Sequence, residues 1–108
     1  MEVRWVVHTG WPSQLGLQRI VSAFTRSDRC SQFKIGITGN PIRRASQYPY
    51  AYDEMVVLYK TMSERFVRDT EGFLTDLYWE DCDNSIRGRS GRLSGAPYYL
   101  YVVLRHWW

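Results

Sequence analysis

Hydrophobic and polar positions along the chain fall into short apolar runs and longer stretches with helical spacing. Runs rich in β-branched and aromatic residues predict strands at Val3–Val7, Phe33–Thr38, Met55–Lys60 and Tyr98–Leu104. Helical spacing predicts helices over Pro12–Phe24, from Asn40-Pro41 to about Gln47, and over Glu64–Trp79. Asn40, followed by a proline, and Ser63 are good helix N-caps. The polar stretches Ser27–Ser31 and Asp81–Gly95 are predicted to be loops.

Strands and helices therefore alternate along the whole chain. This order predicts an α/β or α+β fold, with a small mixed or antiparallel sheet of three or four strands flanked by helices. The chain has 108 residues, which suits a single domain over residues 1–108. No apolar stretch is long enough to span a bilayer and the N-terminus has no signal-peptide pattern, so we expect no membrane partner.

Composition supports a packed core and an anionic partner. Hydrophobic residues make up 44% of the chain and aromatic residues 16%. The formal net charge is +3, and among the 14 Lys and Arg residues only Lys34 and Lys60 are lysines. Arginine binds phosphate with two parallel hydrogen bonds, so this bias favours nucleic acid, although a charge of +3 is also common elsewhere. Cys30 and Cys82 fit no metal-ligand spacing and are expected to be free thiols in a cytoplasmic protein.

The segment from Lys34 to Tyr48 carries the most informative chemistry. Gly36 lies in the middle of a predicted strand, where glycine usually marks a bulge or a close approach. Arg44 and Tyr48 are four residues apart and share one face of the following helix. With Lys34 on the strand, these side chains can surround one phosphate. The plainer alternative is a packing glycine, a solvated arginine and a tyrosine that caps the core.

The same segment, KIGITGNPIRRASQY, resembles the second half of the motif of the GIY-YIG nuclease family. Gly36, Thr38 and Arg44 fall at places that match a YIG or KIG strand, a turn and a helix with an essential arginine. Tyr48 matches the His or Tyr that often follows one helical turn later. Glu71 matches a metal-binding glutamate on a later helix, and Asn84 precedes a Gly-rich stretch as in the family. The resemblance covers Phe33 to Tyr101.

The resemblance implies a metal-dependent endonuclease that cuts one phosphodiester bond, with DNA favoured over RNA as substrate. It implies a divalent ion, Mg²⁺ or Mn²⁺, held by Glu71, and charge stabilisation by Arg44. Lys34 takes the place of the family's second tyrosine, and a tyrosine hydroxylate or a metal-bound water activates the attacking water. Asn84 would orient Glu71 or a backbone turn.

Glu71 is also a candidate site residue independently of the resemblance to the GIY-YIG family. On a helix it lies in line with Val67, Leu74 and Tyr78, a row that is otherwise apolar or aromatic. A carboxylate at the edge of such a row needs a partner, because burying a bare charge is costly. A divalent cation is one candidate, and Arg68 or another arginine is the other.

The first half of the family motif is absent, and two replacements remain open. By strand order, His8 stands where the family places its first tyrosine, and a neutral histidine can act as a base near pH 7. Alternatively, the C-terminal strand Tyr98–Val102 pairs beside the KIG strand and supplies the phenol of Tyr99 or Tyr101. Tyr48, Tyr50 and Tyr52 offer further phenols near Arg44.

Two other functions are consistent with the sequence. If no base reaches the site, the domain binds nucleic acid without cutting it, through residues suited to phosphate contacts: Arg43, Asn84, Arg87, Arg89 and Arg92. A protein-interaction module that uses Trp107 and Trp108 is the third. Since a domain of this size has little surface for reading a base sequence, we also expect low specificity, a homodimer or a partner protein.

Overall fold

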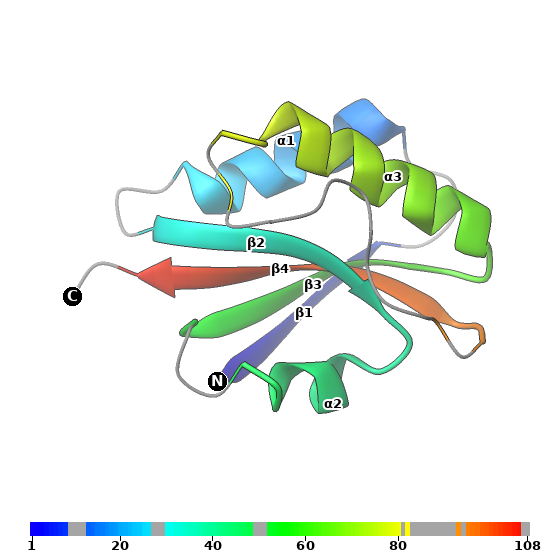
Figure 1. The fold of residues 1–108 in the computed structure, drawn as a ribbon, viewed down its shortest axis with the longest axis horizontal. Helices are drawn as coiled ribbons and strands as arrows, with labels where there is room; N and C mark the ends of the chain where they lie inside the picture. The colour runs from blue at the N-terminus through cyan, green and yellow to red at the C-terminus, as the bar shows by residue number, and fades with distance from the viewer. Residues whose placement is uncertain are drawn as a thin grey trace.

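The predicted order of strands and helices is confirmed. The computed structural model describes residues 1–8, 13–26, 30–48, 52–80, 82, 93 and 95–106 (Figure 1). The elements follow one another as β1 (Glu2–His8), α1 (Gln14–Thr25), β2 (Cys30–Thr38), α2 (Pro41–Ala45), β3 (Glu54–Thr61), α3 (Glu64–Leu77) and β4 (Tyr98–His106). The result is a mixed α and β fold, as the sequence predicts.

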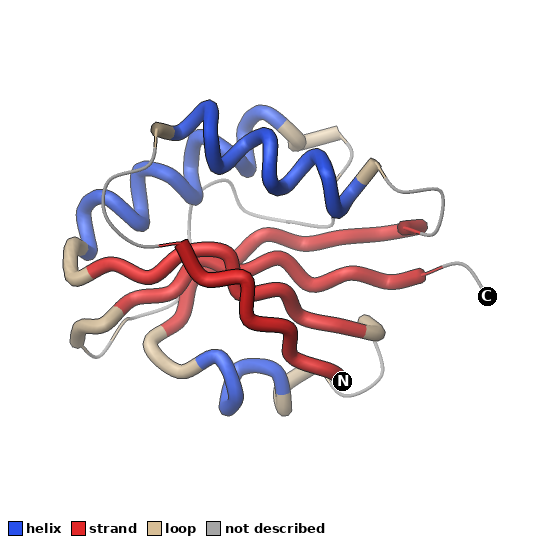
Figure 2. Tube along the Cα trace, turned by 180° about the vertical axis from the view of Figure 1, so that it is seen from behind, coloured by secondary structure: helices blue, strands red, loops and turns tan. Residues whose placement is uncertain are grey.

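The four strands form one mixed sheet in the order β1-β3-β4-β2. β1 runs parallel to β3, whereas β4 is antiparallel to both β3 and β2. The last strand of the chain therefore lies inside the sheet, next to the edge strand β2. Helices α1 and α3 cover one face, here called the two-helix face, and the short α2 lies on the other, here called the α2 face (Figures 1 and 2).

Each face of the sheet has its own apolar core, because neighbouring residues of a strand point to opposite faces. Along β4, Leu100, Val102 and Leu104 pack on the two-helix face, while Tyr101 and Val103 pack on the α2 face. Helix α3 adds Val67 and Leu74 to the first core. On the α2 face, the second core contains Ala45, Met55, Val57, Tyr101 and Val103. Alternate residues of β4 therefore pack in different cores, on opposite faces of the sheet.

The helix starts follow from local capping. The Asn40 side chain accepts from the Arg43 amide at 3.0 Å, and the Ser63 hydroxyl accepts from the Phe66 amide at 3.1 Å, so both predicted caps are confirmed. Ser13 caps α1 in the same way, and that helix begins one residue later, at Gln14 rather than Pro12. Within the described ranges, no helix combines the length and the apolar character that crossing a bilayer would need.

Three further element boundaries differ from the predictions. Cys30 and Ser31 belong to β2 instead of a loop, and the Ser31 hydroxyl donates to the Arg105 carbonyl of β4 at 3.1 Å. Polar residues suit this end of β2 because an edge strand exposes one side to solvent. Helices α2 and α3 end earlier than expected, at Ala45 and Leu77.

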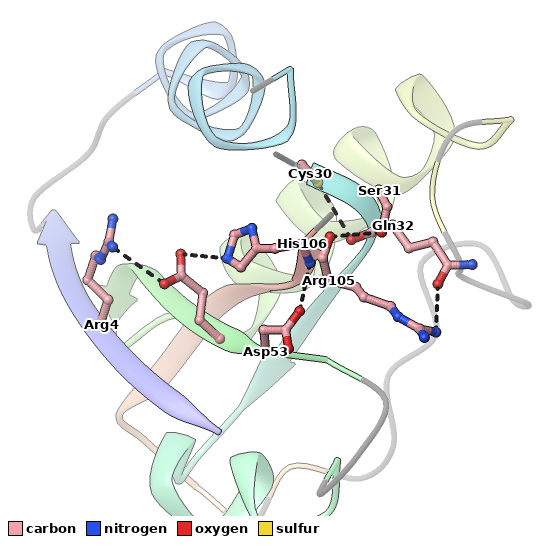
Figure 3. A network of polar contacts seen from close by, with 8 residues as sticks. Arg4, Cys30, Ser31, Gln32, Asp53, Arg105 and His106 are labelled. Atoms are coloured by element: carbon pink, nitrogen blue, oxygen red, sulfur yellow. Dashed lines mark hydrogen bonds and ion pairs between the residues drawn. The ribbon is translucent and has the colours of Figure 1, made fainter. Parts of the chain in front are cut away.

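A polar network holds the end of the sheet where β3 begins (Figure 3). Glu54, 7% exposed, lies 3.4 Å from the Arg4 guanidinium of β1 and 3.9 Å from His106 Nε2 of β4. The Asp53 carboxylate accepts from the His106 amide at 2.7 Å. Because these contacts join β1, β3 and β4, they fix the register in which β4 enters the sheet.

Gly36 makes room for an aromatic ring from the neighbouring strand. It lies opposite Tyr101 in the β2–β4 ladder, and both residues are buried. A Cβ atom added at Gly36 would overlap the hydroxyl oxygen and the Cζ atom of Tyr101. The mid-strand glycine is therefore a close-approach position.

We expect Gly36→Ala to lower the free energy of unfolding by about 1–3 kcal/mol, because the new methyl group forces the Tyr101 ring to shift. Urea denaturation of Gly36→Ala in the wild-type and the Tyr101→Ala backgrounds measures the effect. The loss should be much smaller once the ring is gone. An equal loss in both backgrounds would show that the glycine serves some other purpose.

Candidate functional site

Four side chains that bear hydroxyl or cationic groups meet on the α2 face. They are Lys34 of β2, Arg44 of α2, Tyr48 just after α2, and Tyr101 of β4, and we call them the Arg44 cluster. Arg44 Nε donates to the Tyr101 hydroxyl at 3.1 Å, and the Tyr48 and Tyr101 hydroxyl oxygens are also 3.1 Å apart. Arg44 and Tyr48 are thus joined by hydrogen bonds to Tyr101, a residue far away in sequence.

The Asn40 cap and the short α2 helix position Arg44 for these contacts. The cap fixes where the helix starts, and Ala45 packs into the core of the α2 face. Arg44, the residue before it, is half-buried, and its Nη1 atom donates to Gln47 Oε1 at 2.6 Å. A guanidinium has more N–H donors than these two bonds use, so it can also bind an anion.

Tyr48 lies between the two cations of the cluster. The Arg44 Cζ atom is 5.2 Å from the centroid of the Tyr48 ring, and the Lys34 Nζ atom is 5.7 Å from it. Both distances suit cation–π attraction, which holds the lysine and the arginine close despite their like charge. Two positive groups and two phenols therefore occupy one small region, an arrangement suited to phosphate.

Tyr101 is a neutral anchor for the arginine. Only 1% of it is exposed, and this burial raises the pKa of its phenol well above the ordinary value. Interaction with Tyr48 raises the pKa further, while the hydrogen bond from Arg44 acts in the opposite direction. At neutral pH the phenol is protonated, so Tyr101 orients Arg44 and is poorly suited to act as a base.

Arg44 keeps its charge in this setting. Partial burial lowers the pKa of the guanidinium, but the hydrogen bond and electrostatic interaction with Tyr101, together with those of Tyr48, outweigh burial. The net shift is upward. The site therefore presents a fixed, oriented positive charge to any anion that reaches the α2 face.

Glu71 lies on the other side of the sheet from Arg44. It is 2% exposed on α3 and shares a helical row with Val67 and Leu74, which pack in the core of the two-helix face. The resemblance implies that Arg44 and Glu71 act on the same phosphate, but α2 and α3 cover opposite faces, so the two residues do not share one site (Figure 1). The sequence places Glu71 correctly in a buried row but does not reveal which face of the sheet that row covers.

A divalent ion at the Arg44 cluster is not supported by the residues around it. The cluster and its partner Gln47 contribute cations, phenols and an amide, whereas Mg²⁺ prefers carboxylate oxygens. Nor do the described ranges contain a group of three or more His, Cys, Asp or Glu residues placed to hold a metal. In the part of the chain that the structure describes, the metal expected from the resemblance does not fit at this site.

Of the two replacements for the missing strand, the structure favours the C-terminal one. β4 pairs antiparallel with β2 and places Tyr101 against Gly36. His8 ends β1, the opposite edge of the sheet, with β3 and β4 between it and β2, so it does not reach Lys34. The order of strands along the chain suggested that His8 takes the place of the family's first tyrosine. The order of strands in the sheet is set by pairing, however, and it places His8 on the far edge.

Tyr99 lies on the same face as Tyr101 but makes different contacts. Its ring centroid is 6.0 Å from that of Trp5, and Lys60 Nζ is 5.9 Å from the Tyr99 ring. Tyr101, not Tyr99, therefore supplies the phenol that contacts Arg44.

The other predicted residues are placed as follows. Arg43 is exposed on α2, next to Arg44 in sequence. Several predicted residues lie outside the described ranges: Tyr50, Asn84, Arg87, Arg89, Arg92, Trp107 and Trp108.

Sequence reasoning overlooked Gln47 and the two neighbours of Tyr99, which are Trp5 and Lys60. Gln47 follows Arg44 by three residues, a spacing that brings side chains together on a helix, so it could have been found. Trp5 and Lys60 come from different strands, and no local spacing links them to Tyr99.

Comparison of the chain with protein-family models, with curated proteins and with solved structures finds no match. The resemblance to the GIY-YIG family therefore depends on the residues themselves and on their arrangement.

The raised pKa of Tyr101 predicts that alkaline pH destabilises the protein. The unfolded phenol ionises near pH 10, whereas the folded phenol is still protonated there, so the folded state binds more protons. The stabilisation is complete below about pH 10 and is lost as the pH rises from the unfolded pKa towards the folded one, with a slope of up to about 1.4 kcal/mol per pH unit.

Urea denaturation at a series of pH values measures this effect. Between neutral pH and the alkaline limit, the wild type should lose stability more steeply than Tyr101→Phe, which lacks the titrating group. Leu15→Ala removes an exposed apolar side chain and no ionisable group, so this control should follow the wild-type curve. Parallel curves for the wild type and Tyr101→Phe would contradict the assignment.

Proposed function

We propose that the protein is a GIY-YIG-like endonuclease that hydrolyses a phosphodiester bond of a nucleic acid, DNA in preference to RNA, at the Arg44 cluster. One observation carries the proposal: the Tyr101 phenol of the last strand accepts a hydrogen bond from Arg44 beside the Lys34-Ile35-Gly36 strand. The resemblance calls for a tyrosine strand, a KIG strand and an arginine helix in one place. Here they meet although their order along the chain differs.

The changed order is compatible with one site, because a sheet is defined by pairing and not by chain order. In the family the tyrosine strand precedes the KIG strand, whereas β4 comes at the C-terminal end and pairs with β2 from within the sheet. The sequence Tyr99-Leu100-Tyr101 would stand for the GIY tripeptide. Tyr101 then corresponds to the family's first tyrosine and Lys34 to its second.

In this proposal Arg44 and Lys34 bind the non-bridging oxygens of the phosphate and stabilise the negative charge that grows on them. The oxygen of an attacking water forms a bond to phosphorus while the ester P–O bond breaks, and the proton that the water gives up ends on the leaving oxygen. Tyr48 is the half-buried phenol of the cluster and so can contact the water, whereas Tyr101 orients Arg44. No step is assigned to a metal ion.

Binding without cleavage is the second candidate function. It is favoured by the position of Glu71, which lies across the sheet from Arg44, because the resemblance assigns that glutamate to the catalytic metal. A binding domain needs only the positive charge of Lys34, Arg43 and Arg44. A dimer or partner protein would then supply whatever specificity the domain lacks.

A cleavage assay tests the proposal on supercoiled plasmid and on labelled single-stranded DNA and RNA, each with Mg²⁺, Mn²⁺ or EDTA. We expect Arg44→Ala to reduce the cleavage rate by roughly 10²–10³-fold, the usual cost of losing one donor that stabilises the transition state. Arg65→Ala is the matched control, because Arg65 is an exposed arginine on α3, across the sheet. It should cleave like the wild type.

The other outcomes separate the two candidates. Cleavage lost in Arg44→Ala but retained in Glu71→Gln would support a site built on the α2 face. Salt-dependent binding without cleavage of any substrate would establish the second candidate. If Arg44→Ala and Arg65→Ala cleave and bind as the wild type does, the Arg44 cluster is not the site.

A further inference from the structure

A second feature of the α2 face is a pair of aromatic rings beside a lysine. Trp5 of β1 and Tyr99 of β4 meet edge to face, with ring centroids 6.0 Å apart and an interplanar angle of 82°. Lys60 of β3 lies opposite Tyr99, with its Nζ atom 5.9 Å from that ring. We call these three side chains the Trp5 platform.

The platform is open to solvent. Trp5 is 48% exposed, Tyr99 is half-buried and Lys60 is exposed. Its place on the α2 face follows from pairing, since Trp5 lies opposite Val57, a core residue of that face. Ring surface of Trp5 and Tyr99 therefore faces solvent beside the positive charge of Lys60.

The platform adjoins the Arg44 cluster along β4. Tyr99 and Tyr101 are two residues apart and point to the same face of the strand, so their Cα atoms are roughly 6.8 Å apart. This spacing is close to the length of one extended nucleotide. A nucleic-acid strand with a phosphate at Arg44 can therefore place a neighbouring base near Tyr99 and Trp5. Lys60 adds positive charge there, which suits the adjacent phosphate.

We propose that the Trp5 platform binds an unpaired nucleobase by stacking, so that the substrate of this site is single-stranded or locally unpaired nucleic acid. The inference rests on the proposed function only in placing a phosphate at Arg44. Aromatic side chains bind single strands because every base offers a ring face, whereas in a duplex those faces are already stacked on neighbouring bases. The Trp5 platform would thus bind single-stranded nucleic acid in preference to a duplex, because only the single strand has accessible base faces.

Fluorescence anisotropy with three labelled DNA probes tests this: a single-stranded oligonucleotide, its blunt duplex, and a single strand of the same length made of abasic sites. We expect Trp5→Ala to weaken binding of the single strand by about tenfold or more, the usual effect of losing one stacked base. Binding of the duplex and of the abasic strand should not change, since neither offers a free base. Trp5→Phe should restore most of the loss.

Two further variants complete the design. Leu15→Ala removes another exposed apolar side chain, 62% exposed on α1 across the sheet, and should bind all probes like the wild type. Arg44→Ala should weaken binding of all three probes and reduce the salt dependence, because it removes a phosphate contact.

The results distinguish failure of this inference from failure of the proposed function. Equal affinity of Trp5→Ala and wild type for the single strand, or an equal loss for all probes, would overturn the stacking site. Unchanged binding by Arg44→Ala would overturn the phosphate site alone. A wild-type protein that binds none of the probes would overturn both.

Discussion

The antiparallel pairing of β2 with β4 is the constraint on which the rest of this structure depends. It brings the last strand of the chain beside the strand that leads into α2, and it sets Tyr101 opposite Gly36. The glycine leaves space for the ring, the buried phenol holds the Arg44 guanidinium, and Tyr48 and Lys34 gather around them. If the register moved by one residue, Tyr101 would point to the two-helix face and the cluster would be lost.

Features set by neighbouring residues could be predicted from the sequence. The capping of α2 by Asn40 and the alternation of strands with helices depend on local chemistry. Gly36 was predicted to mark a bulge or a close approach, and which of the two it is depends on Tyr101, a residue distant in sequence. The face of the sheet on which a helix packs could not be predicted. Helical spacing indicates that Glu71 lies in a core-facing row of α3, but it does not show which face of the sheet α3 covers. The partner of β2 was likewise open, since pairing joins residues distant in sequence.

The α2 face combines two chemistries on one side of the sheet. The Arg44 cluster offers oriented positive charge suited to phosphate, and the Trp5 platform offers exposed rings suited to bases. The opposite face is closed by α1 and α3 over an apolar core, in which Glu71 is buried (Figure 2). Beside the short α2 helix, Trp5 of this face remains 48% exposed, which supports the proposal that nucleic acid binds on the α2 face.

NMR of the arginine Nε–H groups shows whether the Arg44 guanidinium binds a nucleic-acid phosphate. The Arg44 signal can be assigned as the one missing from Arg44→Lys, then followed as a short single-stranded oligonucleotide is added. If Arg44 binds the phosphate, its signal shifts at lower oligonucleotide concentration than the exposed Arg65 signal, and Tyr101→Phe weakens the response. An Arg44 signal that stays in place while other arginines respond would rule out a phosphate site at Arg44.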